Sequence, residues 1–154
     1  MNMEMMTSLG NAGAAAVLGL AALGSALGTG TAGMAAVGAW KKCYAQSKTA
    51  PFILMVFIGA PLSQTIYGMI LMFQMAQPVT QDMEAAFVSW PAMISAGIFG
   101  GMAMAASAWF QGKAGAAGAD ALAETGQGFG NYLMTIGIVE TVALFVLVFI
   151  QAAL

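Results

Sequence analysis

The sequence predicts an all-α integral membrane protein whose four transmembrane helices make up nearly the whole chain. Of the 154 residues, 60% are hydrophobic and 6% are charged, whereas a soluble domain carries about 25% charged residues. Four apolar runs are long enough to cross a hydrocarbon core, which needs roughly 20 apolar residues. The alternation of a membrane β-barrel is absent, and lipid requires backbone groups to pair internally, so the runs are expected to be helices.

The four predicted helices lie at about residues 9–39, 51–76, 88–119 and 129–153. The first and third are rich in glycine and alanine, whereas the second and fourth carry bulky apolar residues. Small residues at every third or fourth position let membrane helices approach closely. We therefore expect the first and third helices to pack inside, the second and fourth to form an outer layer, and several copies to assemble into a closed ring.

The connections at 41–50, 77–85 and 120–128 are too short to hold a soluble catalytic domain. The segment "QGKA" at 111–114 is not a phosphate-binding loop, because Ser107 stands at the first glycine position and Ala114 at the Ser/Thr position. With a net charge of −2 and no histidine, the chain offers no support for nucleic-acid binding or a histidine metal site. We expect a protein that is not itself an enzyme and has no organic cofactor.

The lysines predict the orientation of the helices in a cell membrane. Three of the four, Lys41, Lys42 and Lys48, lie in or beside the first connection. Because cytoplasmic loops carry an excess of basic residues, the first and third connections are expected to face the cytoplasm and both termini the outside. The charged residues of the outer side would then all be acidic, namely Glu4, Asp82 and Glu84.

Residues 24–39 resemble residues 106–121, which pairs Ser25 with Ser107, Gly30 with Gly112 and Gly33 with Gly115. A weaker alignment of 62–68 with 140–146 puts Leu62 opposite Glu140. The pattern predicts a single membrane domain built from a duplicated helical hairpin, 9–76 and 88–153, in which only the second copy keeps a carboxylate. Coincidental similarity between Gly/Ala-rich segments is the alternative.

Glu140 is the only charged residue of the last apolar run. A charge at the centre of a membrane helix costs roughly 2.5–3.5 kcal/mol on insertion scales, and carboxylates in such positions usually mark ion or proton paths. The alternative is a protonated carboxyl group that serves only as a hydrogen bond between helices.

Further polar residues of the second and third runs lie at a depth where they could meet Glu140. The segment "APLSQTIYG" (60–68) holds Ser63 and Tyr67 on one face, with Gln64 about 100° around the helix. Pro61 frees local backbone carbonyls, and Gln111 lies in the third run. This collection of oxygens suits a hard cation, whereas a proton needs only the carboxylate. Each glutamine taken singly is also explained as a hydrogen bond between helices.

Lys113 is two residues from Gln111, about 200° around the helix. It is therefore expected to face away from Glu140 and to extend its long stem toward the cytoplasmic end. The chain has no arginine, so a positive charge that competes for Glu140 would have to come from another protein.

At these residues the chain resembles the sixteen-kilodalton proteolipid of V-type and A/V-type rotary ATPases, which builds the membrane rotor ring. The resemblance rests on the doubled hairpin, the Gly-rich first and third helices, "VET" at 139–141, "QGK" at 111–113 and "P-x-S-Q-x-x-Y-G" at 61–68. It implies a V-ATPase proteolipid active in ion transport, with identical copies in a ring, a stator membrane subunit that supplies an arginine, and a central-stalk subunit as partners.

The two glutamines are typical of the sodium-translocating branch of these proteolipids, found in bacterial cell membranes. The resemblance implies a Na⁺ site made of Glu140, Gln111, Gln64, Ser63 and the backbone carbonyl of Ala60. It also implies a hydrogen bond from Tyr67 to the carboxylate. Ser63 replaces the usual Thr and keeps the oxygen, whereas Leu62 stands where that branch often has Gly.

Three other functions compete with sodium transport by rotation. A proton-translocating ring would use the same Glu140 with H⁺ in place of Na⁺. A small multidrug/proton antiporter also uses one intramembrane Glu, but it needs an aromatic pocket for organic cations; here Glu140 is flanked by Val, Thr and Ile. A structural packing protein would explain the glycines and leave Glu140 without a role.

Overall fold

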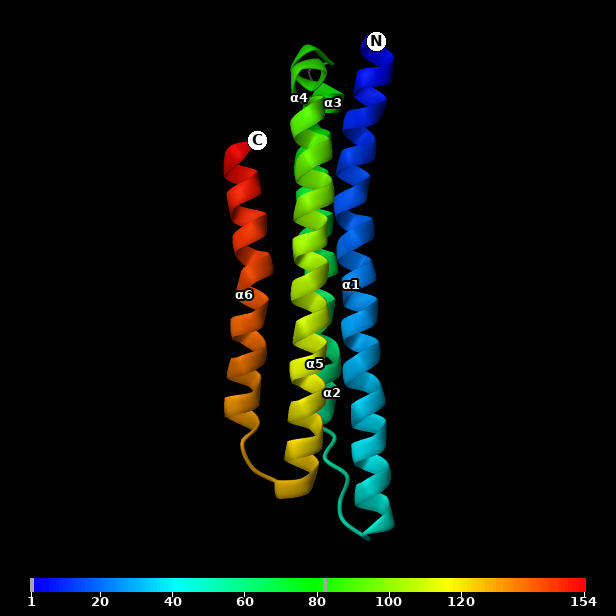
Figure 1. Ribbon diagram of the computed structural model, residues 1–154, viewed down its shortest axis with the longest axis vertical. Coiled ribbons are helices and arrows are strands. Elements are labelled where there is room, and N and C mark those ends of the chain that lie inside the picture. The colour runs from blue at the N-terminus through cyan, green and yellow to red at the C-terminus, as the bar shows by residue number, and fades with distance from the viewer. Residues whose placement is uncertain (1, 82) are drawn as a thin grey trace.

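The computed structural model describes residues 2–81 and 83–154, and the side chains of residues 77–88 lie outside this description. The described part is built from long helices joined by short connections, with no strand among its elements (Figure 1). The predicted connection at 77–85 is wrong in its extent, because the chain is helical up to Gln81 and again from Met83, and residue 82 between them lies outside the description. Of the two acidic residues expected there, Asp82 lies outside the described residues, and Glu84 is described only as part of the helix that begins at Met83, without its side chain.

The described helices form four rods, which run along the long axis of the molecule (Figure 1). The first is α1 (Met3–Ala45). The second consists of α2 (Leu54–Gly59), a 3₁₀ turn η1 (Ala60–Leu62) and α3 (Ser63–Gln81). The third consists of α4 (Met83–Ser95), a π-helical segment η2 (Ala96–Gly100) and α5 (Gly101–Thr125), and the fourth is α6 (Phe129–Ala153).

Each rod contains a stretch long and apolar enough to cross a membrane, which confirms the prediction of an all-α protein with four spans. The first and third rods are longer than the predicted spans at 9–39 and 88–119, whereas α6 has the predicted bounds, 129–153. At 1.5 Å per residue the 43 residues of α1 extend about 65 Å, roughly twice the thickness of a hydrocarbon core. Hydropathy marks only the apolar part of a helix, whereas the polar flanking residues continue its backbone hydrogen bonding.

The helix ends show local signals in the sequence. The side chain of Asn2 accepts a hydrogen bond from the Met5 N–H at 2.9 Å and so caps the start of α1. Between α5 and α6 the chain turns through Gly126 and Gly128, whose φ angles of 68° and 87° lie in the left-handed region. Glycine adopts this region without steric penalty, so the turn can be short.

Helices α1 and α5 run side by side in the same direction (Figure 1) and form the most extensive helix pair. Their backbones nearly touch at small residues: a Cβ added to Gly112 would collide with the backbone of Gly28, and one added to Gly24 with that of Ala105. This close approach is what the Gly-rich pattern predicts. Parallel packing is also what two hairpins of the same orientation require, although the duplication and the ring stay predictions.

Helix α6 is the outermost element, and it packs against α5 and, less extensively, against α3. It has the smallest buried share of the four spans, and bulky apolar residues such as Ile138, Phe145 and Phe149 are exposed along it. A long helix with an apolar exposed face suits contact with lipid or with other membrane helices.

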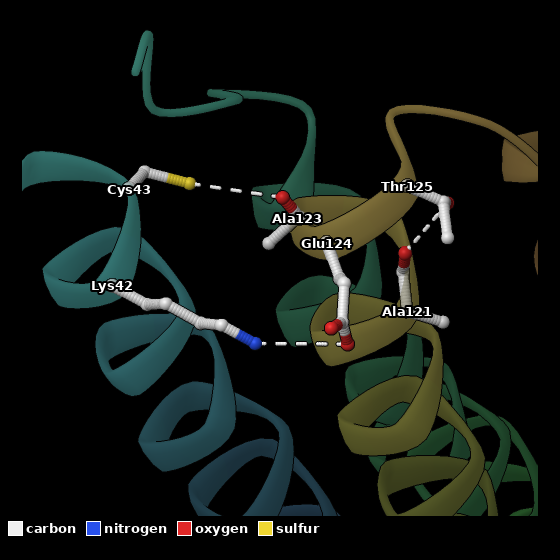
Figure 2. A network of polar contacts seen from close by, with 6 residues as sticks. All are labelled: Lys42, Cys43, Ala121, Ala123, Glu124 and Thr125. Carbon is white, nitrogen blue, oxygen red and sulfur yellow. Dashed lines mark hydrogen bonds and ion pairs between the residues drawn. The ribbon is translucent and has the colours of Figure 1, made fainter. Parts of the chain in front are cut away.

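Both termini lie at one end of the molecule, and the 45–54 and 125–129 connections lie at the other (Figure 1). At the latter end Lys42 pairs with Glu124 at 3.6 Å, and the buried Cys43 thiol lies 3.9 Å from the Ala123 carbonyl (Figure 2). Both partners of the ion pair are well exposed, so it contributes at most about 1 kcal/mol. Lys41, Lys42 and Lys48 all gather at this end, and which side of the membrane it faces stays a prediction from them.

We expect the substitution Gly112→Ala to destabilise the folded chain by about 1–3 kcal/mol or more, because the added methyl group would collide with the Gly28 backbone. Gly30→Ala is the matched control, since nothing lies within 4 Å of the Cβ position there. Alanine favours a helix over glycine by about 1 kcal/mol, so the control should be neutral or slightly stabilising. Thermal unfolding followed by circular dichroism in detergent measures both, and equal melting temperatures would contradict close α1–α5 packing.

Candidate functional site

A layer of polar side chains crosses the bundle between two apolar clusters. On the side of the termini lies a cluster that includes Val17, Leu71, Met104 and Leu147. Toward the 45–54 connection lies a second cluster that includes Leu54, Phe57, Leu122 and Ile136. Each long rod contributes to both clusters and places its polar residues between them. Apolar side chains therefore cover the polar layer on both sides along the bundle axis. In such a low-dielectric environment hydrogen bonds are electrostatically stronger than in water.

Glu140 lies close to the middle of α6 and is partly exposed. The Tyr67 hydroxyl donates a hydrogen bond to Oε1 of Glu140 at 2.6 Å, and the Gln111 amide donates to Oε2 at 3.3 Å. Hydrogen bonds to a charged group contribute roughly 1.5–3 kcal/mol each. Two of them are therefore comparable to the roughly 2.5–3.5 kcal/mol insertion cost of a charge at mid-membrane.

The two glutamines are fully buried and bonded to one another. The Gln64 amide nitrogen donates to Oε1 of Gln111 at 2.8 Å. The Gln111 amide nitrogen, besides contacting Glu140, lies 3.4 Å from the Ile136 carbonyl. In this arrangement Gln111 presents N–H groups rather than its oxygen to the carboxylate, so coordination of a cation through that oxygen would require the amide to rotate.

The oxygens expected from the second run meet beside Gln64. The Ser63 hydroxyl lies 3.0 Å from the Ala60 carbonyl and 3.2 Å from Oε1 of Gln64, with geometry to donate to either oxygen. All six predicted residues, Ala60, Ser63, Gln64, Tyr67, Gln111 and Glu140, are thus brought into one hydrogen-bonded set. Their role as ion ligands stays a prediction.

Pro61 produces the expected irregularity in the second rod. It lies in the 3₁₀ turn η1 between α2 and α3, and it cannot donate to the carbonyl of Phe57 four residues earlier. At that carbonyl α5 comes close: a Cβ on Gly115 would lie 3.0 Å from the Phe57 oxygen. Leu62, which stands where related proteins often have Gly, is 51% exposed and does not displace Ser63 or Ala60 from the set.

Ser107 belongs to the same set, although sequence reasoning did not propose it as a site residue. Its hydroxyl donates to the Val139 carbonyl at 2.9 Å and accepts from the Gln64 amide at 3.4 Å. Its position one helical turn before Gln111, on the same face of α5, was the available signal. Small hydroxyl residues are common in membrane helices, so spacing alone did not separate Ser107 from a packing residue.

Lys113 faces away from the site, as its angular position predicts, but it does not extend toward the 125–129 connection. Its Nζ atom lies 4.2 Å from the ring centroid of Trp109, one turn nearer the start of α5, and 5.0 Å from that of Phe110. The attraction of an ammonium group to an aromatic face, roughly 0.5–2 kcal/mol, explains the difference. The ring of Trp109, the tryptophan nearest in sequence to Gln111, is therefore covered by Lys113 rather than facing Glu140.

The fold and the site together define a class: a multi-pass helical membrane protein with one carboxylate held at mid-span by polar groups of other helices. Residues 94–150 match the family model of the C subunit of ATP synthase. The matched segment covers the second hairpin, with Ser107, Gln111 and Glu140, and leaves the first hairpin outside. The match covers less than half of the chain, and it shows that the second hairpin is similar to this rotor-ring proteolipid family. No curated protein matches the chain.

We expect Tyr67→Phe to raise the rate at which a hydrophobic carbodiimide modifies Glu140 by roughly tenfold at fixed pH. The reagent attacks the protonated acid, and the substitution removes a hydrogen bond that stabilises the carboxylate by roughly 1.5–3 kcal/mol. Tyr132→Phe is the control, because Tyr132 lies on α6 and makes no hydrogen bond to Glu140. Unchanged labelling in Tyr67→Phe would contradict the contact between Tyr67 and Glu140.

Proposed function

We propose that this chain is a rotor-ring subunit of a V-type or A/V-type rotary ATPase and that each copy carries one Na⁺ on Glu140. The observation that carries the proposal is the convergence of α3, α5 and α6 on a carboxylate at mid-span, with buried amide and hydroxyl groups around it. The partial exposure of Glu140 on the outer helix α6 gives an ion a route on and off the ring.

The preference for sodium rests on the number and kind of the neighbouring oxygens. Carboxylate, carbonyl and hydroxyl oxygens are the ligands that hard cations prefer. Besides Glu140, the set offers Oε1 of Gln64, the Ser63 hydroxyl and the Ala60 carbonyl, and Oε1 of Gln111 after rotation of its amide. A ring that carries protons needs none of these additional oxygens.

A proton-carrying ring is the second candidate, and one observation favours it. The polar groups satisfy one another without a cation, since Gln64 donates to Gln111 and both Gln111 and Tyr67 donate to Glu140. A protonated Glu140 fits this set as well, with its own hydrogen shared with a neighbouring oxygen.

Rotation requires partners that the chain itself does not provide. Moving one charge across a membrane takes about 2.3 kcal/mol per 100 mV, so uphill transport must be driven by ATP hydrolysis on other subunits. Lys113 lies over Trp109 rather than beside Glu140, which leaves an arginine of a stator subunit to displace the ion. The connections at the lysine-bearing end, proposed to be cytoplasmic, would contact a central-stalk subunit.

The arrangement of the aromatic residues disfavours an antiporter. The Trp40 indole donates a hydrogen bond to the Pro51 carbonyl in the 45–54 connection, and the ring face of Trp109 contacts the Lys113 ammonium group. The aromatic side chain bonded to Glu140 is Tyr67, which contacts the carboxylate through its hydroxyl rather than its ring face. An aromatic cage for an organic cation would need ring faces directed at the charge.

We expect Glu140→Gln to abolish ion pumping in the assembled ATPase while the ring still forms. The amide keeps the shape of the side chain and can no longer carry a cation or a proton. Glu124→Gln is the control, because Glu124 is exposed at the lysine-bearing end, where it pairs with Lys42, and this variant should pump normally. Pumping into sealed vesicles measures both, and full transport by Glu140→Gln would overturn the proposed function.

We expect Na⁺ to protect Glu140 from carbodiimide modification at fixed pH, because a bound cation keeps the carboxylate deprotonated and out of reach. Labelling should fall at least tenfold between sodium-free buffer and saturating sodium. Choline chloride at equal ionic strength controls for salt effects. Labelling that follows pH and ignores sodium would make this a proton ring, and the glutamines would then serve only to join helices.

A further inference from the structure

We propose that Ser107 is a positioning residue that determines which atom of the Gln64 amide faces the ion, and so sets the sodium affinity without contacting the ion. This inference rests on the proposed sodium function. Ser107 is 5% exposed and lies on α5, between Gln64 of α3 and Val139 of α6. It joins three helices through a single hydroxyl group.

The direction of the hydrogen bonds through Ser107 follows from its acceptor. The Val139 carbonyl can only accept, so the single hydrogen of the Ser107 hydroxyl is committed to it at 2.9 Å. The Ser107 oxygen is then left as an acceptor for its other neighbour. Gln64 must therefore present its NH₂ group to Ser107, which it does at 3.4 Å.

The Gln64 amide has two hydrogens, and both are used inside the protein. One is directed to Oε1 of Gln111 at 2.8 Å and the other to Ser107. Oε1 of Gln64 is consequently directed to the opposite side, next to the Ser63 hydroxyl at 3.2 Å. This is the side on which the Ala60 carbonyl also lies, 3.0 Å from the same hydroxyl.

An amide turned the other way would place N–H donors where a cation needs oxygens. Gln64 is fully buried, so water cannot compensate a reversed amide, and an unsatisfied buried group is strongly disfavoured. Because the bond from Ser107 to Val139 does not involve Glu140, it persists whether the carboxylate is protonated, free or bound to an ion. Ser107 therefore keeps the Gln64 oxygen directed at the site throughout the transport cycle.

The internal alignment supplies a matched control in Ser25, which it pairs with Ser107. Ser25 lies on the glycine-rich helix α1 as Ser107 lies on α5, and it is 2% exposed. Its hydroxyl has no hydrogen-bond partner among the described residues. Ser25→Ala thus removes the same atom from an equally buried position outside the hydrogen-bonded set.

The test uses the assembled rotary complex and measures the sodium concentration that half-protects Glu140 from carbodiimide at fixed pH. We expect Ser107→Ala to raise this concentration about tenfold and Ser25→Ala to leave it within twofold of the unaltered protein. The pH dependence of labelling in sodium-free buffer should be alike in all three, because Tyr67 and Gln111 still contact Glu140 directly. Ser107→Thr keeps the hydroxyl, so it should show the same half-protecting sodium concentration as the unaltered protein.

Each result decides the proposal. Equal sodium dependence of Ser107→Ala and the unaltered protein overturns it, as does an equal loss in Ser25→Ala. If Ser107→Ala changed the pH dependence of labelling in sodium-free buffer by as large a factor as it changed the half-protecting sodium concentration, Ser107 would have a general structural role instead. If Ser107→Ala does not assemble, Ser107→Cys, which keeps the size with a weaker donor and acceptor, must show a rise of at least threefold. If sodium does not protect the unaltered complex, the proposed sodium function itself fails, and this inference fails with it.

Discussion

The stable placement of a carboxylate at the middle of a membrane span is the constraint on which the rest of this structure depends. Glu140 can remain there only if other helices bring hydrogen-bond donors to it, because lipid offers none. Tyr67 and Gln111 meet that need from α3 and α5. Helices α3, α5 and α6 must therefore hold a common level and a common rotation.

The small residues make this convergence geometrically possible. A Cβ added to Gly28 would collide with the backbone of Ala108 and would lie 2.8 Å from the Pro61 ring. Pro61 and Ala108 are neighbours of the polar residues of α3 and α5, so larger side chains at Gly28 would move both helices away from Glu140. Close packing of backbones thus has a direct consequence for the site, in addition to its contribution through dispersion contacts.

The site has a buried half and an accessible half. Gln64, Gln111 and Ser107 are almost completely enclosed, and two apolar clusters close the bundle on either side along its axis. Glu140 lies on the outer helix, and no atom of another helix lies within 4 Å of the Cβ position of Gly137, about one turn away on α6. A buried set of partners behind a partly exposed carboxylate is the arrangement that repeated loading and release of an ion would require.

The sequence by itself determined that the chain is a helical membrane protein with four spans, set the small-residue helices apart from the bulky ones, and marked Glu140 as an isolated charge. These features are local: hydropathy, glycine spacing and an isolated charge can be identified within one segment. The grouping of Ala60, Ser63, Gln64, Tyr67 and Gln111 with Glu140 was anticipated mainly through a family resemblance, and the structure brings the six together. The lengths of the first and third rods were underestimated, since polar ends leave no hydropathy signal.

Only the tertiary structure decided the contribution of Ser107, the orientation of the two amides and the direction of the Lys113 side chain. Each depends on how far one helix is rotated and shifted against another, and residues such as Ser107 and Gln64 are 43 positions apart in the chain. The 3.6-residue period defines which residues share a face of one helix, but not which face of a second helix lies opposite. The direction of a hydrogen bond, moreover, is defined only when donor, acceptor and the next partner are all in place.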